Sequence, residues 1–192
     1  MLTIKENIIY EYEIKKSKFI TLLYKINNKD EVNDILNTVK TLYKGATHYC
    51  YAYSLINEYH FSDDGEPGGT AGLPILEALK KNDVTNILCI VVRYFGGIKL
   101  GAGGLVRAYT KSVVLAINEA KLLELIDGYK IKLETTYDNT KNIEKVLNKV
   151  KIVNKEFLDK AIYYLIIEKN DINLFSNYKY EILEETKIEK DI

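Results

Sequence analysis

The sequence predicts an α+β protein built from two domains. Stretches with strand and helix patterns follow one another along all 192 residues. Nine of the eleven glycines lie between Gly65 and Gly104, so unusual backbone conformations are concentrated in the first half of the chain. After Asp127 and Gly128, the order strand–helix–strand–strand–helix–strand predicts a ferredoxin-like domain. We therefore expect domains at residues 1–127 and 128–192.

The first domain is expected to contain short strands rich in tyrosine, isoleucine and threonine. These strands are residues 8–14, 18–26, 47–56, 59–62 and 86–95. In the third of them, Tyr49, Tyr51 and Tyr53 alternate with His48 and Cys50, so the two sets lie on opposite faces. The last strand is almost entirely apolar, which predicts that both of its faces are covered.

Three helices are expected in the same domain. Asp30 is the predicted N-cap of the first, whose apolar residues recur at helical spacing until near Gly45. The second begins near Pro74, because proline is tolerated in a first turn, and continues to about Asn82. The third covers residues 105–121. Glycine-rich loops at 62–72 and 96–104 precede the second and third helices.

The second domain follows the ferredoxin-like order. Its expected strands are residues 129–136, 152–157, 161–168 and 180–186, and its expected helices are 139–150 and 172–178. Asp138 or Asn139 is predicted to cap the first of these helices. Leu158, Asp159 and Lys160 fit a hairpin turn between the second and third strands.

Charge composition argues against a protein that binds nucleic acid through its overall charge. The chain carries 27 basic and 27 acidic residues, and each predicted domain is balanced by itself. Anion binding would therefore require a local patch. Arg93 and Arg107 are the two arginines among the 27 basic residues, and they flank the loop 96–104. Since arginine offers a planar fork that lysine cannot copy, geometry is expected to matter there.

The sequence is typical of a cytoplasmic protein. No apolar run approaches the ~20 residues that span a bilayer. The first residues show no basic region followed by an apolar stretch, so we expect no signal peptide and no membrane partner. Cys50 and Cys89 lie in apolar strands, which favours buried free thiols in a reducing compartment.

The loop 96–104 joins a strand to a helix, which is the order that builds phosphate sites from free backbone N–H groups. The candidate residues for binding an anion or RNA are Lys99, Gly101, Gly103, Gly104, Arg107 and Lys111. The Walker A pattern fails at Ala102 and the dinucleotide pattern fails at Val106, so no nucleotide cofactor is expected. The alternative is that the glycines only allow the helix and strand to pack closely.

Asp63, Asp64 and Glu66 form an acidic cluster in the first glycine-rich loop. Three carboxylates can hold a divalent cation, but their spacing does not alternate as in calcium loops. We favour an ion pair between this cluster and Arg93 or Arg107, and we expect no metal.

His48 and Cys50 raise the question of a nucleophile. Residues two apart on one strand face are too far apart for a good hydrogen bond, so a half-buried histidine and a core cysteine are favoured. The tyrosine row could stack RNA bases or form a core, and a core row is more common. No catalytic residue is assigned.

Four long segments resemble the YigZ/IMPACT family. They are THYCYAY at 47–53, FSDDGEP at 61–67, GTAGLPIL at 69–76 and VVRYFGGIKLGAGGLVRAY at 91–109. The resemblance implies a first domain folded like the second domain of a small-subunit ribosomal protein. It implies a second domain similar to the last domain of elongation factor G. Eukaryotic members of the family regulate translation, and no enzymatic activity is accepted for the family.

These observations together predict a non-enzymatic cytoplasmic protein associated with translation. It is expected to bind RNA, a ribosomal surface or a protein through the glycine-rich face of its first domain. One alternative is a small-molecule hydrolase or transferase that uses His48 and the loop of Asp63, Asp64 and Glu66. The other is a module that only binds proteins.

Overall fold

The computed structural model describes residues 1–148 and 150–192, and it divides into two compact units. The first is Met1–Leu123 together with Ile192, and the second is Glu124–Asp191. Asp127 and Gly128, where the sequence predicts the boundary, lie inside the long strand β7 (Leu122–Thr135). None of the described helices is long and apolar enough to cross a membrane.

The first unit contains an antiparallel sheet in the order β2-β3-β6-β4-β5. Its strands are β2 (Ile8–Ile14), β3 (Ser17–Lys25), β4 (His48–Ser54), β5 (Tyr59–Ser62) and β6 (Ile87–Tyr94). All five were predicted to within two residues at each end. The short strand β1 (Leu2–Ile4) was not predicted, because three residues carry too little pattern.

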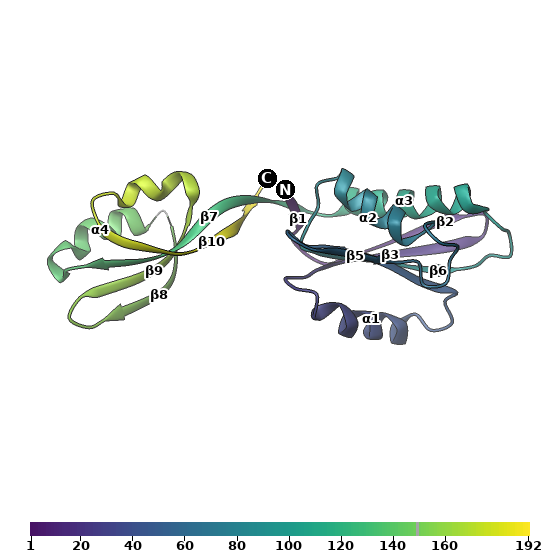
Figure 1. Cartoon of the computed structure of the whole chain (residues 1–192), viewed down its shortest axis with the longest axis horizontal. Coiled ribbons are helices and arrows are strands. Elements are labelled where there is room, and N and C mark those ends of the chain that lie inside the picture. Colours follow the sequence, from purple (N-terminus) through teal and green to yellow (C-terminus); the bar gives the residue numbers. More distant parts are fainter. Residues whose placement is uncertain (149) are drawn as a thin grey trace. The chain divides into compact units, whose positions relative to one another are not determined.

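Helices cover both faces of this sheet (Figure 1). The helix α1 (Glu31–Leu42) lies on one face, and α2 (Gly72–Lys81) and α3 (Ala102–Glu119) lie on the other. Side chains of the central strand β6 alternate between the two cores: Cys89 and Val91 face α2 and α3, whereas Ile90 and Val92 belong to the cluster around α1. The prediction that β6 is covered on both faces is confirmed.

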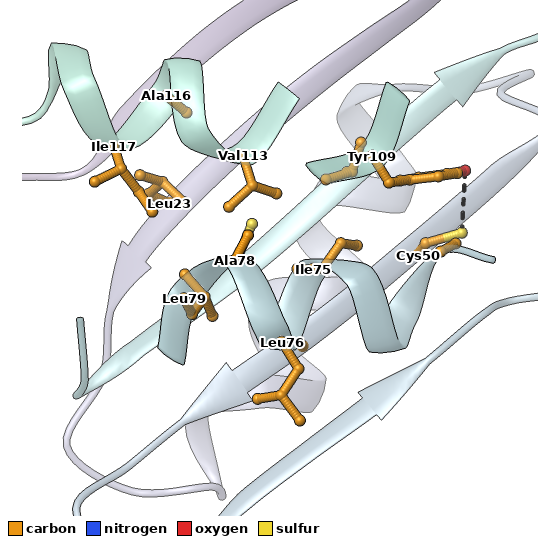
Figure 2. Packing of buried hydrophobic residues seen from close by; sticks show 14 of the residues in the cluster. Leu23, Cys50, Ile75, Leu76, Ala78, Leu79, Tyr109, Val113, Ala116 and Ile117 are labelled. Carbon is orange, nitrogen blue, oxygen red and sulfur yellow. Dashed lines mark hydrogen bonds between the residues drawn. The ribbon is translucent and has the colours of Figure 1, made fainter. Parts of the chain in front are cut away.

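The core between α2, α3 and the sheet contains mainly aliphatic side chains together with the rings of Phe19 and Tyr109. Figure 2 shows Tyr109 and several of the aliphatic side chains. Ile75 and Leu79 of α2 face Val113 of α3, and all three are fully buried. Each such side chain contributes about 1.5–3 kcal/mol through burial. Tyr109 is also fully buried and meets the ring of Phe19 edge-on at 5.1 Å between centroids.

The predicted start of α1 is confirmed, whereas that of α3 is wrong. Asp30 is the N-cap of α1, but its side chain makes no capping hydrogen bond. Instead, Oε1 of Glu31 accepts from the backbone N–H of Asn27 at 2.7 Å. The helix α3 begins at Ala102 and not at residue 105. Gly101 has a φ of 72°, so the chain turns there and the Leu105 N–H already donates to the Gly101 carbonyl at 2.9 Å.

A tight hairpin joins β2 to β3 and supports the glycine loop. Lys15 and Lys16 form its two-residue turn with φ values of 47° and 64°, which glycine or asparagine usually adopts. Gly96 lies against this turn, and its N–H donates to the Ser17 hydroxyl at 3.2 Å. A Cβ atom at Gly96 would come within 2.0 Å of the Lys16 carbonyl group.

The second unit has the sheet order β10-β7-β9-β8, which is the ferredoxin-like order and confirms the predicted class. Its other elements are α4 (Thr140–Leu147), β8 (Lys151–Phe157), β9 (Ala161–Glu168), the 3₁₀ helix η2 (Lys169–Phe175) and β10 (Lys179–Asp191). Its core gathers Ile131, Leu133, Ile143, Leu165 and Phe175.

Both helices of the second unit differ from the predictions. Residues 139–150 were expected to be helical, but α4 ends at Leu147. Residue 149 of that range lies outside the described residues. The second helix is a 3₁₀ helix and not an α-helix over 172–178, since Asn170, Asp171 and Asn173 favour turns over regular helix. Asn139 is the N-cap of α4, but its side chain makes no capping hydrogen bond.

Changing Gly96→Ala is expected to destabilise the first unit by about 3 kcal/mol, because the new methyl group overlaps backbone atoms that cannot move freely. Gly68→Ala is the matched control, since a Cβ at Gly68 would meet nothing within 4 Å. Native-state hydrogen exchange of the β6 amides measures the free energy of unfolding of this unit. Equal protection in the two variants would contradict the close approach at Gly96.

Candidate functional site

Two cavities lie on either side of Leu100 in the first unit. The larger, which we call the Arg93 cavity, has a volume of about 420 Å³. It is lined by Thr47, His48, Glu66, Pro67, Arg93, Phe95, Lys99, Leu100, Gly101, Ala102 and Leu105. The smaller, which we call the Arg107 cavity, has a volume of about 270 Å³. It is lined by Tyr12, Ile14, Lys15, Leu100, Gly104, Arg107, Ala108 and Lys111.

A buried ion pair forms part of the lining of the Arg93 cavity. Nη1 of Arg93 lies 2.5 Å from Oε1 of Glu66, and their side chains are 6% and 3% exposed. The predicted pairing between an arginine and the acidic cluster is therefore confirmed for these two residues. The guanidinium lies 5.5 Å and 5.6 Å from the ring centroids of Phe19 and Phe95, which adds cation–π attraction.

Tyr109 and Cys50 extend this pair into the core. The Tyr109 hydroxyl donates to Oε1 of Glu66 at 2.8 Å. Sγ of Cys50 lies 3.3 Å from the same hydroxyl, as Figure 2 shows. Burial, followed by the nearby Cys50 and Glu66, raises the pKa of Tyr109, so the hydroxyl stays protonated as a donor. Burial raises the pKa of Cys50 to about 12, which leaves a protonated thiol unsuited to nucleophilic attack.

The other two carboxylates of the acidic cluster hold the loop itself. Asp63 accepts from the backbone N–H groups of Gly69 at 2.8 Å, Ala71 at 3.0 Å and Gly72 at 2.8 Å, so it closes the loop onto the start of α2. Asp64 accepts from the N–H of Tyr49 at 2.6 Å. Among the described residues, no three acidic, histidine or cysteine side chains gather in a way that could hold a metal ion.

His48 is held at the edge of the Arg93 cavity in a defined tautomer. Its Nδ1 lies 2.8 Å from the Asp64 carbonyl oxygen. A carbonyl oxygen only accepts, so Nδ1 carries a proton, and the neutral form of the ring then has its lone pair on Nε2. That Nε2 lies 3.9 Å from Oε2 of Glu66. Cys50 is fully buried, so the expected half-buried histidine and core cysteine are confirmed.

The structure divides the residues that the sequence assigned to anion binding. Lys99 and Gly101 line the Arg93 cavity, whereas Gly104, Arg107 and Lys111 line the Arg107 cavity. The start of α3 at Ala102 places Gly103 and Gly104 inside its first turn and not in a loop. This division was not predictable, because it depends on where Leu100 packs.

One basic residue of the Arg107 cavity, Lys15, was not predicted from the sequence; it lines the cavity from the β2–β3 turn. The two adjacent lysines between predicted strands were the sequence feature that could have indicated it. Tyr49, Tyr51 and Tyr53 pack on the cluster around α1, so the tyrosine row belongs to the core.

Comparison with known proteins shows similarity over most of the chain. Residues 15–117 match the Impact N-terminal domain. YvyE of Bacillus subtilis, named an IMPACT family member, is 37% identical and covers 94% of this chain and 85% of its own. The chain belongs to the IMPACT family. Another IMPACT family member, YigZ of Escherichia coli, is 36% identical over 76% of this chain and 74% of its own.

One solved structure of a hypothetical protein also resembles this IMPACT family chain. It has a TM-score of 0.70 at 30% identity and covers 95% of this chain and 97% of its own. The matched region 15–117 contains both glycine-rich loops and all residues of both cavities except Tyr12 and Ile14.

Replacing Glu66→Gln is expected to destabilise the first unit by about 3–5 kcal/mol, because Arg93 would keep its charge in a buried place without a partner. Glu77→Gln, at an exposed position on α2, is the matched control and should change stability by less than about 0.5 kcal/mol. Hydrogen exchange of the β6 amides measures the free energy of unfolding of each variant. If Glu66→Gln lowers that free energy by less than about 1 kcal/mol, the ion pair is not required for the stability of the first unit.

Both thiols are expected to resist modification in the native protein. The raised pKa of Cys50 and the buried position of Cys89 imply reaction with Ellman's reagent at about pH 8 that is at least about a hundredfold slower than for a free thiol. Because the thiolate forms only as pH approaches about 12, native reactivity should stay low across neutral pH. In urea, both thiols should react at once. Rapid reaction of one native thiol would contradict the assigned burial.

Proposed function

We propose that this chain is a non-enzymatic protein associated with translation whose first unit binds RNA through phosphate contacts in the Arg107 cavity. Membership of the IMPACT family supports the proposed role in translation, because that is the role the family resemblance implies. The observation that carries the RNA assignment is local: three cationic side chains of a chain with zero net charge line one small hollow.

The three cations come from two different elements. Lys15 stands on the β2–β3 turn, and Arg107 and Lys111 are one turn apart on α3. No acidic residue is among those that line this cavity. Guanidinium and ammonium groups arranged in this way suit phosphate oxygens, which bind without regard to sequence.

The start of α3 adds to the attraction for anions. Its first turn contains no acidic residue and no side chain caps it, so the positive end of the helix dipole is not neutralised locally. Its first N–H groups, at Ala102, Gly103 and Gly104, have no partner inside the helix. Phosphate groups near Gly104 and Arg107 would gain from both features.

A protein partner is the second candidate, and a specific observation favours it. The side chains of Phe95, Ile98 and Val106, in or next to the glycine-rich loop 96–104, are 46%, 43% and 37% exposed. Exposed large apolar side chains close together are typical of protein-binding surfaces. The hydrolase alternative receives less support, because Asp63 and Asp64 are engaged with backbone N–H groups.

The RNA proposal is tested by fluorescence anisotropy with a labelled single-stranded RNA at low salt. Three phosphate contacts predict that log K falls with log salt with a slope of about −2. Arg107→Ala combined with Lys111→Ala should weaken binding by about tenfold and reduce the slope by about 1.4, equally for RNAs of different sequence.

The matched control combines Lys40→Ala with Lys44→Ala, which removes the same charge at exposed positions on or just after α1. It should keep nearly all of the affinity. If wild type does not bind RNA, or both double variants bind equally, the RNA role of this cavity is wrong and a protein partner becomes the better assignment.

A further inference from the structure

We propose that the Arg93 cavity binds a small zwitterion, specifically a free amino acid with an apolar side chain. The proposal does not depend on RNA binding, because the basic side chains assigned to RNA line the other cavity. It rests on two acceptor atoms with no donor between them, on a positive rim and on an apolar wall.

Two hydrogen-bond acceptors face each other in the lining of the Arg93 cavity. Both hydrogen bonds of the Glu66 carboxylate, from Arg93 and Tyr109, go to Oε1. Within the described residues, Oε2 accepts no hydrogen bond and lies 3.9 Å from Nε2 of His48, which presents its lone pair in the neutral ring. A separation of 3.9 Å is too long for a direct bond, but it allows one ammonium group to donate to both atoms at about 2.8 Å.

The side chain that carries this acceptor is largely buried, which distinguishes it from an ordinary surface carboxylate. The Glu66 side chain is 3% exposed, and it lines the cavity. Buried polar atoms normally find partners, so atoms without one mark a place where a ligand group is expected. A cationic donor is favoured because it would satisfy Oε2 of Glu66 with a charge-assisted hydrogen bond.

A negatively charged ligand group is favoured near the start of α3, at another part of the cavity lining. Gly101 and Ala102 bring the N-terminal end of α3 to the cavity, and no acidic side chain or cap neutralises it. Lys99 lines the cavity beside them and is exposed. A carboxylate therefore has both a helix N-terminus and an ammonium group to bind.

The remaining lining is apolar and the space is small. Phe95, Leu100 and Leu105 provide hydrocarbon surface between the polar groups. A volume of about 420 Å³ lies at the low end of the range for ligand sites, which suits a metabolite and not a nucleotide or cofactor. A free amino acid with an apolar side chain fits all three parts of the lining. Its ammonium group meets Glu66, its carboxylate meets Lys99 and the start of α3, and its side chain meets the apolar wall.

The test uses the full chain and three probes of matched shape, measured by isothermal titration calorimetry. L-Leucine carries both charged groups, 3-methylbutylamine lacks the carboxylate, and 4-methylpentanoate lacks the ammonium. L-Leucine should bind at least about tenfold more tightly than either of the others, because each lost group leaves a charge-assisted hydrogen bond unmade. Amide chemical shifts in NMR spectra should change around His48, Glu66 and Gly101.

Lys99→Gln should weaken L-leucine binding by about twofold to fivefold and leave 3-methylbutylamine binding unchanged, since only the carboxylate meets this side chain. Lys81→Gln, at an exposed position on α2, is the matched control and should change neither. His48→Ala should weaken L-leucine and the amine but not 4-methylpentanoate, and the same NMR spectra show whether that variant is folded.

The proposal is overturned if L-leucine does not bind, or if all three probes bind equally, which would indicate apolar contact alone. It is also overturned if chemical shifts change outside the Arg93 cavity or if Lys99→Gln weakens the amine as much as L-leucine.

Discussion

The ion pair between Glu66 and Arg93 connects the parts of the first unit that surround its glycine-rich loops. Glu66 lies in the loop before α2, Arg93 lies on the central strand β6, and Tyr109 brings α3 to the same oxygen atom. Bringing two charges out of water is costly, and the hydrogen bond that Tyr109 donates to Glu66 offsets part of that cost. The positions of both loops, and of the Arg93 cavity between them, therefore depend on this network.

Close backbone approach is the second constraint on this region. Gly96 lies where the β2–β3 turn touches the loop after β6, and no side chain fits there. Asp63 closes the other loop onto the start of α2 with three backbone hydrogen bonds. Glycines and a carboxylate thus fix loops that have little regular structure, and Leu100 between them separates a basic hollow from one that contains both signs of charge.

Much of the fold was predictable because its patterns are local. The strands β2 to β6 follow from residue type and alternation, and the order β10-β7-β9-β8 follows from one recurring arrangement of six elements. Helix ends were less predictable: the side chain of Glu31 and not of the N-cap Asp30 accepts from the backbone before α1, and α3 starts three residues early at Ala102. Several residues can satisfy the same free N–H groups, so the sequence alone does not choose among them.

By itself, the sequence determined the α+β class, the family and the pairing of an arginine with the acidic loop, because a rare arginine among lysines is a chemical signal that needs no coordinates. Only the tertiary structure decided that Asp63 and Asp64 serve the backbone, that Lys15 joins Arg107 and Lys111, and that His48 faces Glu66. The reason is that these contacts join residues far apart in sequence, whose distances depend on how helices and strands pack.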